Sequence, residues 1–377
     1  MNSPYQICSR CVMDSSDPLI EFSENGFCNH CTDYLKIRIG HINQDPSNLK
    51  PLITLFDQIK RKGKGKKYDC VIGMSGGVDS SFLAVLAAEH GLRVMCVHLD
   101  NGWNSPIAVE NIRTLVKRLK FSYSSYVLPW SSFRKVQLAF LQASVPEAET
   151  PTDVAIQKAV HDTALKYKIS YILSGGNMAS EGILPDSWHY NARDTKYSHA
   201  ILRHANIPIK LFKSQRFGFI DEFYAKIIRR IKTVYPLNHI SYDKNHARLM
   251  LEQEYDWKYY GSKHGESKYT KFIQTYLLVK RHGIDYRRAT LSSEICTDKI
   301  SREEALKILE NTPYQESEVD EQIIYIAKKL KISKKELLDI INLAPRWYFN
   351  FPNNIKNLGR MYDLYRFLLG KEKTSNF

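Results

Sequence analysis

The sequence predicts an α/β fold built on a parallel sheet. Between residues 69 and 173, short apolar strands alternate with helical segments, which is the pattern of repeated strand–helix units. A glycine-rich turn directly follows the first strand of this series. After Gly176 the alternation ends, and irregular aromatic and basic residues lead into a helical C-terminal part.

The expected elements follow one another closely from residue 48 onward. A first helix is expected at 48–61, and a Gly/Lys linker at 62–67 follows it. Strands are expected at 69–73, 93–99, 122–128 and 170–173, with helices at 80–89, 108–119, 131–143, 155–167, 221–233 and 268–281. Capping boxes at 301–304 and 333–336 each open an apolar-periodic run. We therefore expect three regions, 1–45, 46–240 and 241–377.

Composition is that of an ordinary globular protein, with 43% hydrophobic and 25% charged residues among 377. No apolar run approaches bilayer length, and the polar start Met1–Pro4 lacks the apolar segment of a signal peptide, so we expect a cytoplasmic protein without a membrane partner. The net charge of +14 suits an anionic partner such as a nucleotide, although it also serves solubility. Basic residues are scattered, so a nucleic-acid partner is not expected.

The turn Met74–Ser81 carries the features of a phosphate-binding loop. Gly76 and Gly77 permit unusual backbone angles and close approach of amides to an anion. Hydroxyl donors stand beside them, at Ser75, Ser80 and Ser81. The following helix adds the partial positive charge of its N-terminus. An ordinary capped strand–helix turn is the alternative interpretation.

The turn is neither a Walker A motif nor a G-x-G-x-x-G fingerprint. Its sequence, Ser-Gly-Gly-Val-Asp-Ser, resembles the PP-loop of the adenine-nucleotide alpha-hydrolase superfamily. The resemblance implies a PP-loop core that binds ATP and cleaves between its α and β phosphates. It also implies that Asp79 serves as a ligand, or a water-mediated partner, of Mg²⁺.

Two further strand ends are expected at the same site, because ligands of open α/β sheets bind beyond the carboxyl ends of the strands. One contains His98 and Asp100, and the resemblance implies that it flanks adenine or ribose. The other contains Gly175 and Asn177 and is similar to the second loop of these enzymes. His98 is equally consistent with a structural histidine, and Asn177 with a simple turn.

Four cysteines near the N-terminus form two Cys-x-x-Cys pairs, Cys8/Cys11 and Cys28/Cys31, with sixteen residues between the pairs. This spacing is typical of a four-thiolate zinc site, which is closed and therefore structural. The segment is too short and polar for a core of its own, so metal binding would supply its folding energy. Four unrelated thiols are the alternative interpretation.

A zinc knuckle before a PP-loop occurs in some tRNA-thiolating enzymes and in the N-acetyl sugar amidotransferases of surface-polysaccharide and nonulosonic acid biosynthesis. The chain resembles the second family over nearly its whole length. The segments that carry this resemblance are 7–14, 24–31, 257–272, 284–289 and 301–306. Thiolation lacks obvious machinery, because no Cys-x-x-Cys follows Cys31.

The amidotransferase resemblance implies that ATP adenylates the amide oxygen of an acetamido group on a nucleotide-linked sugar. Ammonia then displaces AMP and leaves an acetamidino group. Candidate catalytic residues implied by the matching segments are Asp79, Lys263, Glu266, Lys271, Arg287 and Arg288. Lys271 and Arg288 are also consistent with surface charges or salt-bridge donors.

The chain has no glutaminase signature, because Cys70, Cys96 and Cys296 lie in the wrong contexts and residue 2 is Asn. We therefore expect ammonia from a separate glutaminase, acting with a cyclase-like subunit as the family implies. Two other readings stay open: a tRNA-modifying PP-loop enzyme, and a non-enzymatic ATP-binding scaffold. The sequence analysis thus predicts ATP, Mg²⁺ and a structural Zn²⁺ as ligands.

Overall fold

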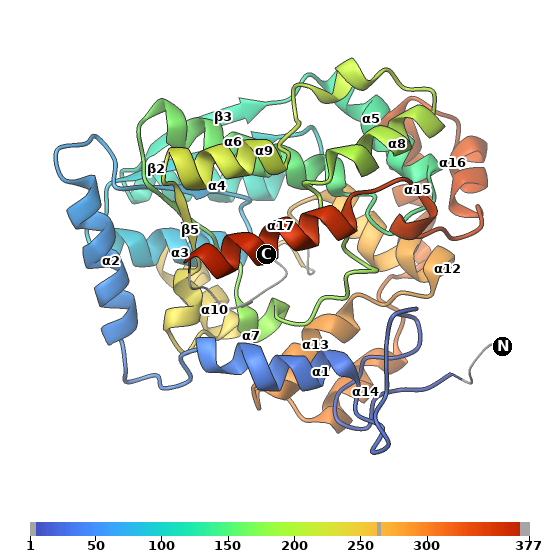
Figure 1. Ribbon diagram of the computed structural model, residues 1–377, viewed down its shortest axis with the longest axis horizontal. Coiled ribbons are helices and arrows are strands. Elements are labelled where there is room, and N and C mark those ends of the chain that lie inside the picture. The colour runs from blue at the N-terminus through green and yellow to red at the C-terminus, as the bar shows by residue number, and fades with distance from the viewer. Residues whose placement is uncertain (1–4, 262–264, 370–377) are drawn as a thin grey trace.

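Five parallel strands form the centre of the computed structural model, which describes residues 5–261 and 265–369 (Figure 1). The strands are β1 (Cys70–Gly73), β2 (Val94–Asp100), β3 (Ser122–Val127), β4 (Tyr171–Leu173) and β5 (Lys232–Val234). Their spatial order is β3-β2-β1-β4-β5, and every neighbouring pair is parallel. The predicted α/β class with a parallel sheet is therefore confirmed.

Helices surround this sheet and make up most of the C-terminal part (Figure 1). They are α1 (Asn29–Asp33), α2 (Lys50–Gly63), α3 (Val78–Glu89), α4 (Pro106–Arg118), α5 (Trp130–Gln142), α6 (Thr150–Lys166), α7 (Met178–Glu181), α8 (Thr195–His204), α9 (Phe219–Phe223), α10 (Lys244–Glu254), α11 (Lys268–Phe272), α12 (Leu278–His282), α13 (Arg287–Cys296), α14 (Arg302–Glu310), α15 (Glu316–Leu330), α16 (Lys334–Ile341) and α17 (Ile355–Leu369). A π-helical turn, Tyr224–Ile228, continues α9, and another, Ile273–Leu277, joins α11 to α12. Among the described helices, none is long and apolar enough to cross a bilayer.

Both faces of the sheet are covered, which explains why β1 is an uninterrupted apolar run. Ile72 shares a buried cluster with Leu83 of α3, whereas its neighbour Val71 shares a different cluster with Ala159 of α6. Successive side chains of a strand point to opposite faces. A parallel strand between two layers of helices must therefore be apolar at every position.

The strand order reverses between β1 and β4. From β1 the chain builds outward through β2 to β3, and it then returns to place β4 on the other side of β1. The connections therefore diverge at the carboxyl ends of β1 and β4 and leave a crevice there, which is where open α/β sheets bind ligands. The loops that begin at Met74 and Ser174 meet at this point.

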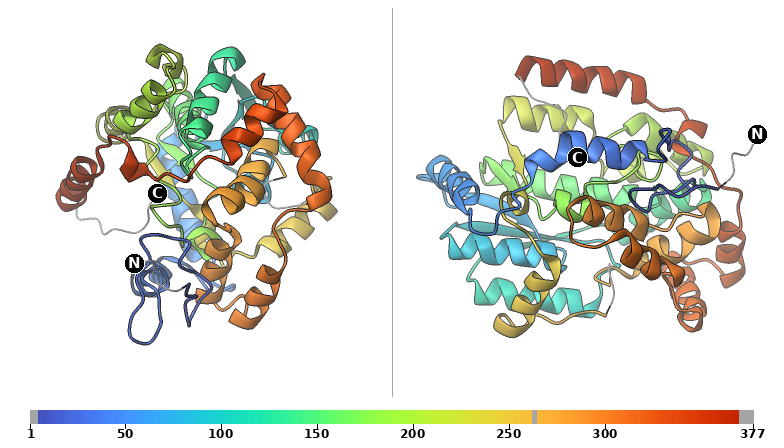
Figure 2. Two further views of the ribbon diagram at one scale, coloured as in Figure 1. Left: turned by 90° about the vertical axis from the view of Figure 1, so that its right-hand side faces the viewer. Right: turned by 90° about the horizontal axis from the view of Figure 1, so that it is seen from below.

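The N-terminal segment packs on the helical C-terminal part, far from it in sequence. We call residues 5–35 the cysteine knuckle; it lies beside α13 and α14 (Figures 1 and 2). Its cysteines belong to the same buried cluster as Phe272 and Ala289 of the C-terminal helices. The other side of that cluster contains Trp103 and Phe133, so it joins the C-terminal helices to the sheet domain.

The predicted helix at 221–233 is partly wrong. Helical structure ends at Ile228, and residues 232–234 form the edge strand β5. Arg230 adopts a left-handed conformation with φ of 54°, which a continuing helix does not allow. Both predicted capping boxes are confirmed, at Ser301/Glu304 of α14 and at Ser333/Glu336 of α16.

Candidate active site

The turn between β1 and α3 is fixed by its own hydroxyls. Ser75 Oγ accepts a hydrogen bond from the Gly77 amide at 3.1 Å and lies 3.1 Å from Ser80 Oγ. The Ser80 hydroxyl in turn donates to the Gly77 carbonyl at 3.2 Å. Gly77 precedes α3 without capping the helix through a side chain, so the helix N-terminus keeps its partial positive charge for an anion.

Glycines let three backbone segments approach one another here. Gly76 has φ of +83°, and a β-carbon on it would lie 2.5 Å from the carbonyl oxygen of Ala108 in α4. A β-carbon on Gly175, in the loop after β4, would lie 3.0 Å from the Ser80 amide nitrogen. Only glycine combines this φ with this crowding at Gly76. The crevice at the strand-order reversal is therefore built by backbone contact.

A cavity of about 540 Å³ opens beside this turn, within the size range of small-molecule sites. Residues from both strand-end loops and from later helices line it: Gly73, Ser75, Gly77, Val78, Asp79, Ser80, Gly175, Gly176, Ser180, Glu181, Lys244, Asn245, Arg248, Tyr259, Tyr260, Glu266, Thr290 and Glu294. The sequence-predicted residues Ser75, Gly77, Asp79, Ser80, Gly175 and Glu266 are thus brought together.

Asp79, in the first turn of α3, has a polar partner on each carboxylate oxygen. The Tyr242 hydroxyl donates to Oδ1 at 2.6 Å, and Lys244 Nζ lies 2.7 Å from Oδ2. Burial would lower the pKa of Lys244, but Asp79, with smaller contributions from the charges of Glu181 and Glu266, outweighs it, so the pKa is raised and the ammonium is retained. A cation therefore stands at the mouth of the glycine turn.

Carboxylates and aromatic rings make up much of the remaining lining. Glu181 of α7, Glu294 of α13 and Glu266 contribute carboxylates to one cavity. Glu266 and Tyr260 lie close to the turn, because a β-carbon on Gly77 would be 3.8 Å from the Glu266 carboxyl carbon and 3.4 Å from the Tyr260 hydroxyl. Burial, with the charge of Glu266, raises the pKa of Tyr260 well above its usual value, so its hydroxyl stays protonated. The cavity therefore combines hydroxyl and amide donors with carboxylate acceptors.

Arg248 of α10 supplies a second cation to this cavity. Its guanidinium lies over the Tyr259 ring, 4.7 Å from the ring centroid. Guanidinium groups bind phosphates and carboxylates through several donors at once. Together with Lys244, it makes α10 the cationic side of the cavity.

Several predicted nucleotide-binding residues lie behind the turn and do not line the cavity. His98 Nδ1 lies 2.9 Å from the Met74 carbonyl oxygen, and burial lowers the His98 pKa, so the ring is neutral and structural. Asp100 accepts a hydrogen bond from the Gly102 amide at 3.0 Å, which closes a turn. Ser81 is fully buried in α3. Asn177 is the buried N-cap of α7, where it accepts a hydrogen bond from the Ser180 amide.

The candidate cations from the C-terminal part are not in the cavity lining. Lys271 Nζ lies 3.0 Å from Glu318 Oε2, and Arg287 binds Asp285. Arg288 makes a buried ion pair with Asp14 of the cysteine knuckle, described below. Lys263 lies outside the described residues. The ion pairs of Lys271 and Arg288 correspond to the salt-bridge alternative that the sequence left open.

The sequence analysis missed Tyr242, Lys244 and Arg248. Asp243 N-caps α10, with its side chain accepting from the His246 amide, so Lys244 falls in the first turn of that helix. The helix packs on α3, and this packing carries Lys244 to Asp79. The cap was readable from the sequence, but nothing local indicates which helix α10 would meet.

The four N-terminal cysteines converge as the spacing predicted. Their sulfur atoms all lie within 4.8 Å of one another, with 3.6 Å between the Cys11 and Cys28 sulfurs and 3.8 Å between those of Cys8 and Cys31. A tetrahedral zinc site with bonds of about 2.3 Å requires sulfur–sulfur edges of about 3.8 Å. The four thiols therefore fit a closed tetrahedral metal site, with Cys8, Cys11, Cys28 and Cys31 as its ligands.

Two segments of the chain match known families. Residues 266–365 match the C-terminal domain of the WbpG-like LPS biosynthesis proteins, and residues 68–120 match the tRNA methyl transferase HUP domain. No curated protein matches the chain significantly. The matches confirm the expected combination of a PP-loop core with a C-terminal region of lipopolysaccharide-biosynthesis type.

The solved structures that the chain resembles are distant in sequence and have low TM-scores. The NH3-dependent NAD synthetase from Campylobacter jejuni is 15% identical with a TM-score of 0.30, over 48% of this chain and 85% of that chain. The NMN synthetase from Francisella tularensis is 13% identical with a TM-score of 0.30, over 56% and 97%. The U34-tRNA thiolase NcsA from Methanococcus maripaludis is 14% identical with a TM-score of 0.34, over 82% and 90%.

Proposed function

We propose that this PP-loop protein is an ATP-dependent amidotransferase that converts the acetamido group of a nucleotide-linked N-acetyl sugar to an acetamidino group, in the synthesis of a surface polysaccharide. One observation supports it above others. The glycine turn of the PP-loop core and residues of the WbpG-like region, Glu266, Thr290 and Glu294, line the same cavity. The nucleotide-binding core and the lipopolysaccharide-biosynthesis region thus share one site.

ATP would bind with its triphosphate at the glycine turn. We call Ser75, Gly77, Ser80 and Gly175 the phosphate end of the cavity; they offer amides and hydroxyls close to the N-terminus of α3. Lys244 and Arg248 stand beside them and would neutralise the β and γ phosphates. Asp79 would hold Mg²⁺ there, which supplies charge neutralisation on the pyrophosphate as it departs. The Lys244 ammonium that pairs with Asp79 in this structure would then contact phosphate instead.

The proposed reaction has two steps. The amide oxygen of the acetamido group attacks the α phosphorus, and pyrophosphate leaves with the bond electrons. Ammonia then adds to the activated carbon, loses protons to a base, and AMP leaves with the original amide oxygen. Glu266 lines the cavity, with its carboxyl carbon 3.8 Å from where a β-carbon on Gly77 would lie, and is the proposed proton acceptor. The products are the amidine, AMP and pyrophosphate.

The sugar would occupy the acidic side. We call Glu181, Thr290 and Glu294 the acceptor wall, because carboxylate and hydroxyl oxygens are suited to the hydroxyl groups of a sugar. Tyr259 and Tyr260 add aromatic surface next to these acceptors. Binding both reactants in one cavity removes the entropy of bringing them together.

Ammonia would come from a separate glutaminase, acting with a cyclase-like partner subunit. All seven cysteines lie in the described part of the chain, and none of them lines the cavity. Cys70 and Cys96 are fully buried in strands of the sheet, and burial raises the pKa of the Cys96 thiol to about 12, so neither is an accessible nucleophile. The same burial argues against a sulfur-carrying role and therefore against tRNA thiolation.

The test is to incubate the purified chain with ATP, Mg²⁺, ammonium and candidate nucleotide-linked N-acetyl sugars. Mass spectrometry should show an amide oxygen replaced by NH, and AMP should form in equal amount. Glutamine should replace ammonium only after the glutaminase partner is added. Formation of ADP, or product from glutamine with this chain alone, would contradict the proposal. Co-purifying RNA with a strongly salt-dependent affinity would favour the tRNA-modifying reading instead.

A further inference from the structure

Helix α13 presents opposite faces to the cysteine knuckle and to the cavity. Successive residues of an α-helix are rotated by about 100°. Arg288 and Ser292, four residues apart, therefore share one face, and Thr290 and Glu294 share a face about 200° away. The first pair contacts the knuckle, and the second pair lines the cavity. The helix thus connects the two sites directly.

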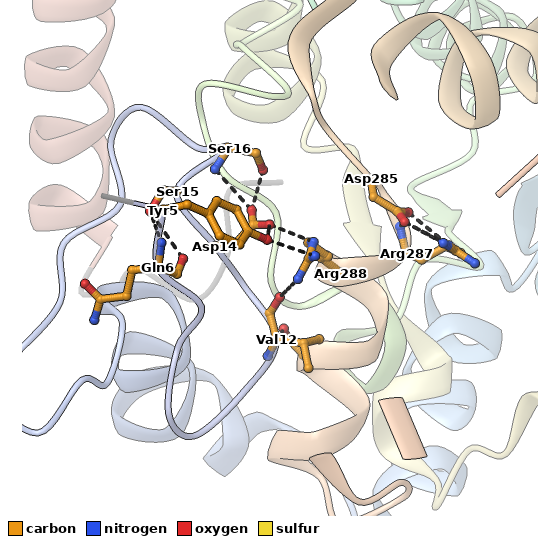
Figure 3. A network of polar contacts seen from close by, with 10 residues as sticks. Tyr5, Gln6, Val12, Asp14, Ser15, Ser16, Asp285, Arg287 and Arg288 are labelled. Atoms are coloured by element: carbon orange, nitrogen blue, oxygen red, sulfur yellow. Dashed lines mark hydrogen bonds and ion pairs between the residues drawn. The ribbon is translucent and has the colours of Figure 1, made fainter. Parts of the chain in front are cut away.

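The contacts on the knuckle side form a connected polar network, part-buried for the most part (Figure 3). Arg288 Nε lies 2.8 Å from Asp14 Oδ2, with only 14% and 3% of the two side chains exposed. The same guanidinium donates to the Val12 carbonyl at 2.7 Å, and the Val12 amide donates to Ser292 Oγ at 3.2 Å. Asp14 is also held inside the knuckle by Ser16, whose amide and hydroxyl donate to Oδ1.

The first Cys-x-x-Cys turn is also hydrogen-bonded to α14. Arg302 of α14 donates to the carbonyl oxygen of Cys8 at 2.9 Å and to that of Cys11 at 3.1 Å. Val12 packs with Leu291 of α13 and Ala305 of α14 in a small buried cluster. The first Cys-x-x-Cys turn therefore packs against both α13 and α14.

A second connection runs through α7, which contributes Ser180 and Glu181 to the cavity. The Tyr34 hydroxyl donates to the Met178 carbonyl at 2.9 Å. The Tyr34 ring lies against Gly182, where a β-carbon would collide with it. The Ile183 amide then donates to Ser293 Oγ of α13 at 2.8 Å. Helices α7 and α13 are therefore held together, and each is also held by the knuckle.

We propose that the cysteine knuckle, folded around its metal, positions α7 and α13 and so sets the geometry of the acceptor wall. The phosphate end is held instead by the sheet domain and by Trp257, whose indole donates to the Gly76 carbonyl at 3.2 Å. Arg288 is a positioning residue in this scheme. The phosphate end comes from β1, α3 and the loop after β4, and within the described part of the chain no hydrogen bond joins these segments to the knuckle. The assignment of the wall to the second substrate rests on the proposed function.

The physical basis is that the knuckle has no independent core. Its buried side chains are mainly the four cysteines, together with Val12, Met13 and Tyr34, which pack on the C-terminal helices. Without metal, four thiols cannot hold the two turns together, because metal binding supplies the folding energy of such modules. Loss of the turns would remove the partners of Arg288 and Ser292 at once and free α13 to shift.

The experiment compares the metal-loaded chain, the chain after chelation, and Arg288→Met. Hydrogen exchange should rise in residues 178–183 and 287–296 but stay unchanged in residues 74–80. The affinity for α,β-methylene ATP should change less than twofold, whereas the KM for the sugar should rise at least tenfold at saturating ATP. The matched control is Arg287→Met, which removes the adjacent arginine paired with Asp285 (Figure 3). It should leave metal content and exchange in residues 178–183 as in the unaltered chain, because Arg287 also binds the Ile308 and Asn311 carbonyls of the α14 end but, among the described residues, has no hydrogen bond to the knuckle or to α7.

Ser292→Ala provides a milder variant should Arg288→Met fail to fold, since it removes only the acceptor of the Val12 amide. It should raise exchange in 287–296 in the same direction by a smaller factor. Unchanged exchange in α13 after chelation would overturn the inference, and so would equal weakening of nucleotide and sugar binding. These exchange and nucleotide measurements do not need turnover, so they decide the inference even if the amidotransferase reaction is not found.

Discussion

Lys244 Nζ lies 2.7 Å from Asp79 Oδ2, which pairs the acidic residue of the first turn of α3 with a lysine 165 positions further along the chain. The pair joins α3 to α10 at the mouth of the glycine turn. Both groups carry charges that suit a magnesium–triphosphate complex, the lysine for phosphate and the carboxylate for the metal. Under the proposed function, the pair would hold one ligand for the phosphates and one for the metal before the nucleotide binds.

Replacing Lys244 with Met should lower sugar-dependent pyrophosphate release about 10–100-fold, because one charge-assisted hydrogen bond contributes about 1.5–3 kcal/mol. The measurement is the initial rate of pyrophosphate release at saturating sugar. The matched control is Lys258→Met, which removes an exposed lysine paired with Glu110 outside the cavity. A Lys244→Met rate equal to that of the Lys258 variant would remove Lys244 from the mechanism.

Asp79→Asn should abolish pyrophosphate release and leave the fold intact. The amide oxygen still accepts the 2.6 Å hydrogen bond from Tyr242, but the side chain loses the charge that would hold Mg²⁺. Combining it with Lys244→Met should cost less than the sum of the two single effects, because the residues act on the same phosphates. Turnover within threefold of the unaltered chain, with Mg²⁺ as the only divalent metal, would exclude Asp79 as its ligand.

Gly76→Ala should destabilise the turn more than Gly65→Ala. Both glycines have positive φ, +83° and +77°, so both substitutions carry the same strain of about 1–2 kcal/mol. A β-carbon on Gly65 meets open space, whereas one on Gly76 lies 2.5 Å from the Ala108 carbonyl oxygen. Thermal unfolding should show a clearly lower Tm for Gly76→Ala, together with weaker nucleotide binding. Equal Tm values for the two variants would show that α4 does not constrain the turn.

The sheet and the glycine turn could be predicted because their signals are local. An apolar run such as 70–73, followed at once by Gly76 and Gly77 and a Leu/Ala-rich helix, specifies strand, turn and helix within about twenty residues. The cysteine cluster was predictable for the same reason, since Cys8–Cys31 is a short stretch with a fixed spacing. The edge strand β5, Lys232–Val234, was missed because it is short and no glycine or proline separates it from the helical run before it.

The placement of the cationic side chains could not be predicted, because it depends on contacts between distant segments. Arg288 was expected to be catalytic, but its partner is Asp14, near the other end of the chain. Lys244 reaches Asp79 only because α10 packs on α3. Tertiary packing decides that Lys244 lies in the cavity and that Arg288 binds the cysteine knuckle, and neither position carries a local sequence signal for its partner.

Glu147 should make the stability of the fold fall as the pH rises. It is 3% exposed, and burial raises its pKa to about 8 from the ordinary value of 4.5, although Tyr197 donates to it at 3.1 Å. The folded state therefore keeps a proton that the unfolded state releases, so the free energy of unfolding declines from about pH 4.5 to about pH 8.

Glu147→Gln keeps the shape of the protonated group and has no proton to lose. Its Tm should match that of the unaltered chain near pH 5 and exceed it increasingly toward pH 8. At pH 8 its free energy of unfolding should be about 2–4 kcal/mol higher than that of the unaltered chain. The control is Glu310→Gln, at an exposed position, which should show no such pH-dependent difference. If the free energies of unfolding of Glu147→Gln and the unaltered chain differed by the same amount at every pH, Glu147 would be ionised inside the fold.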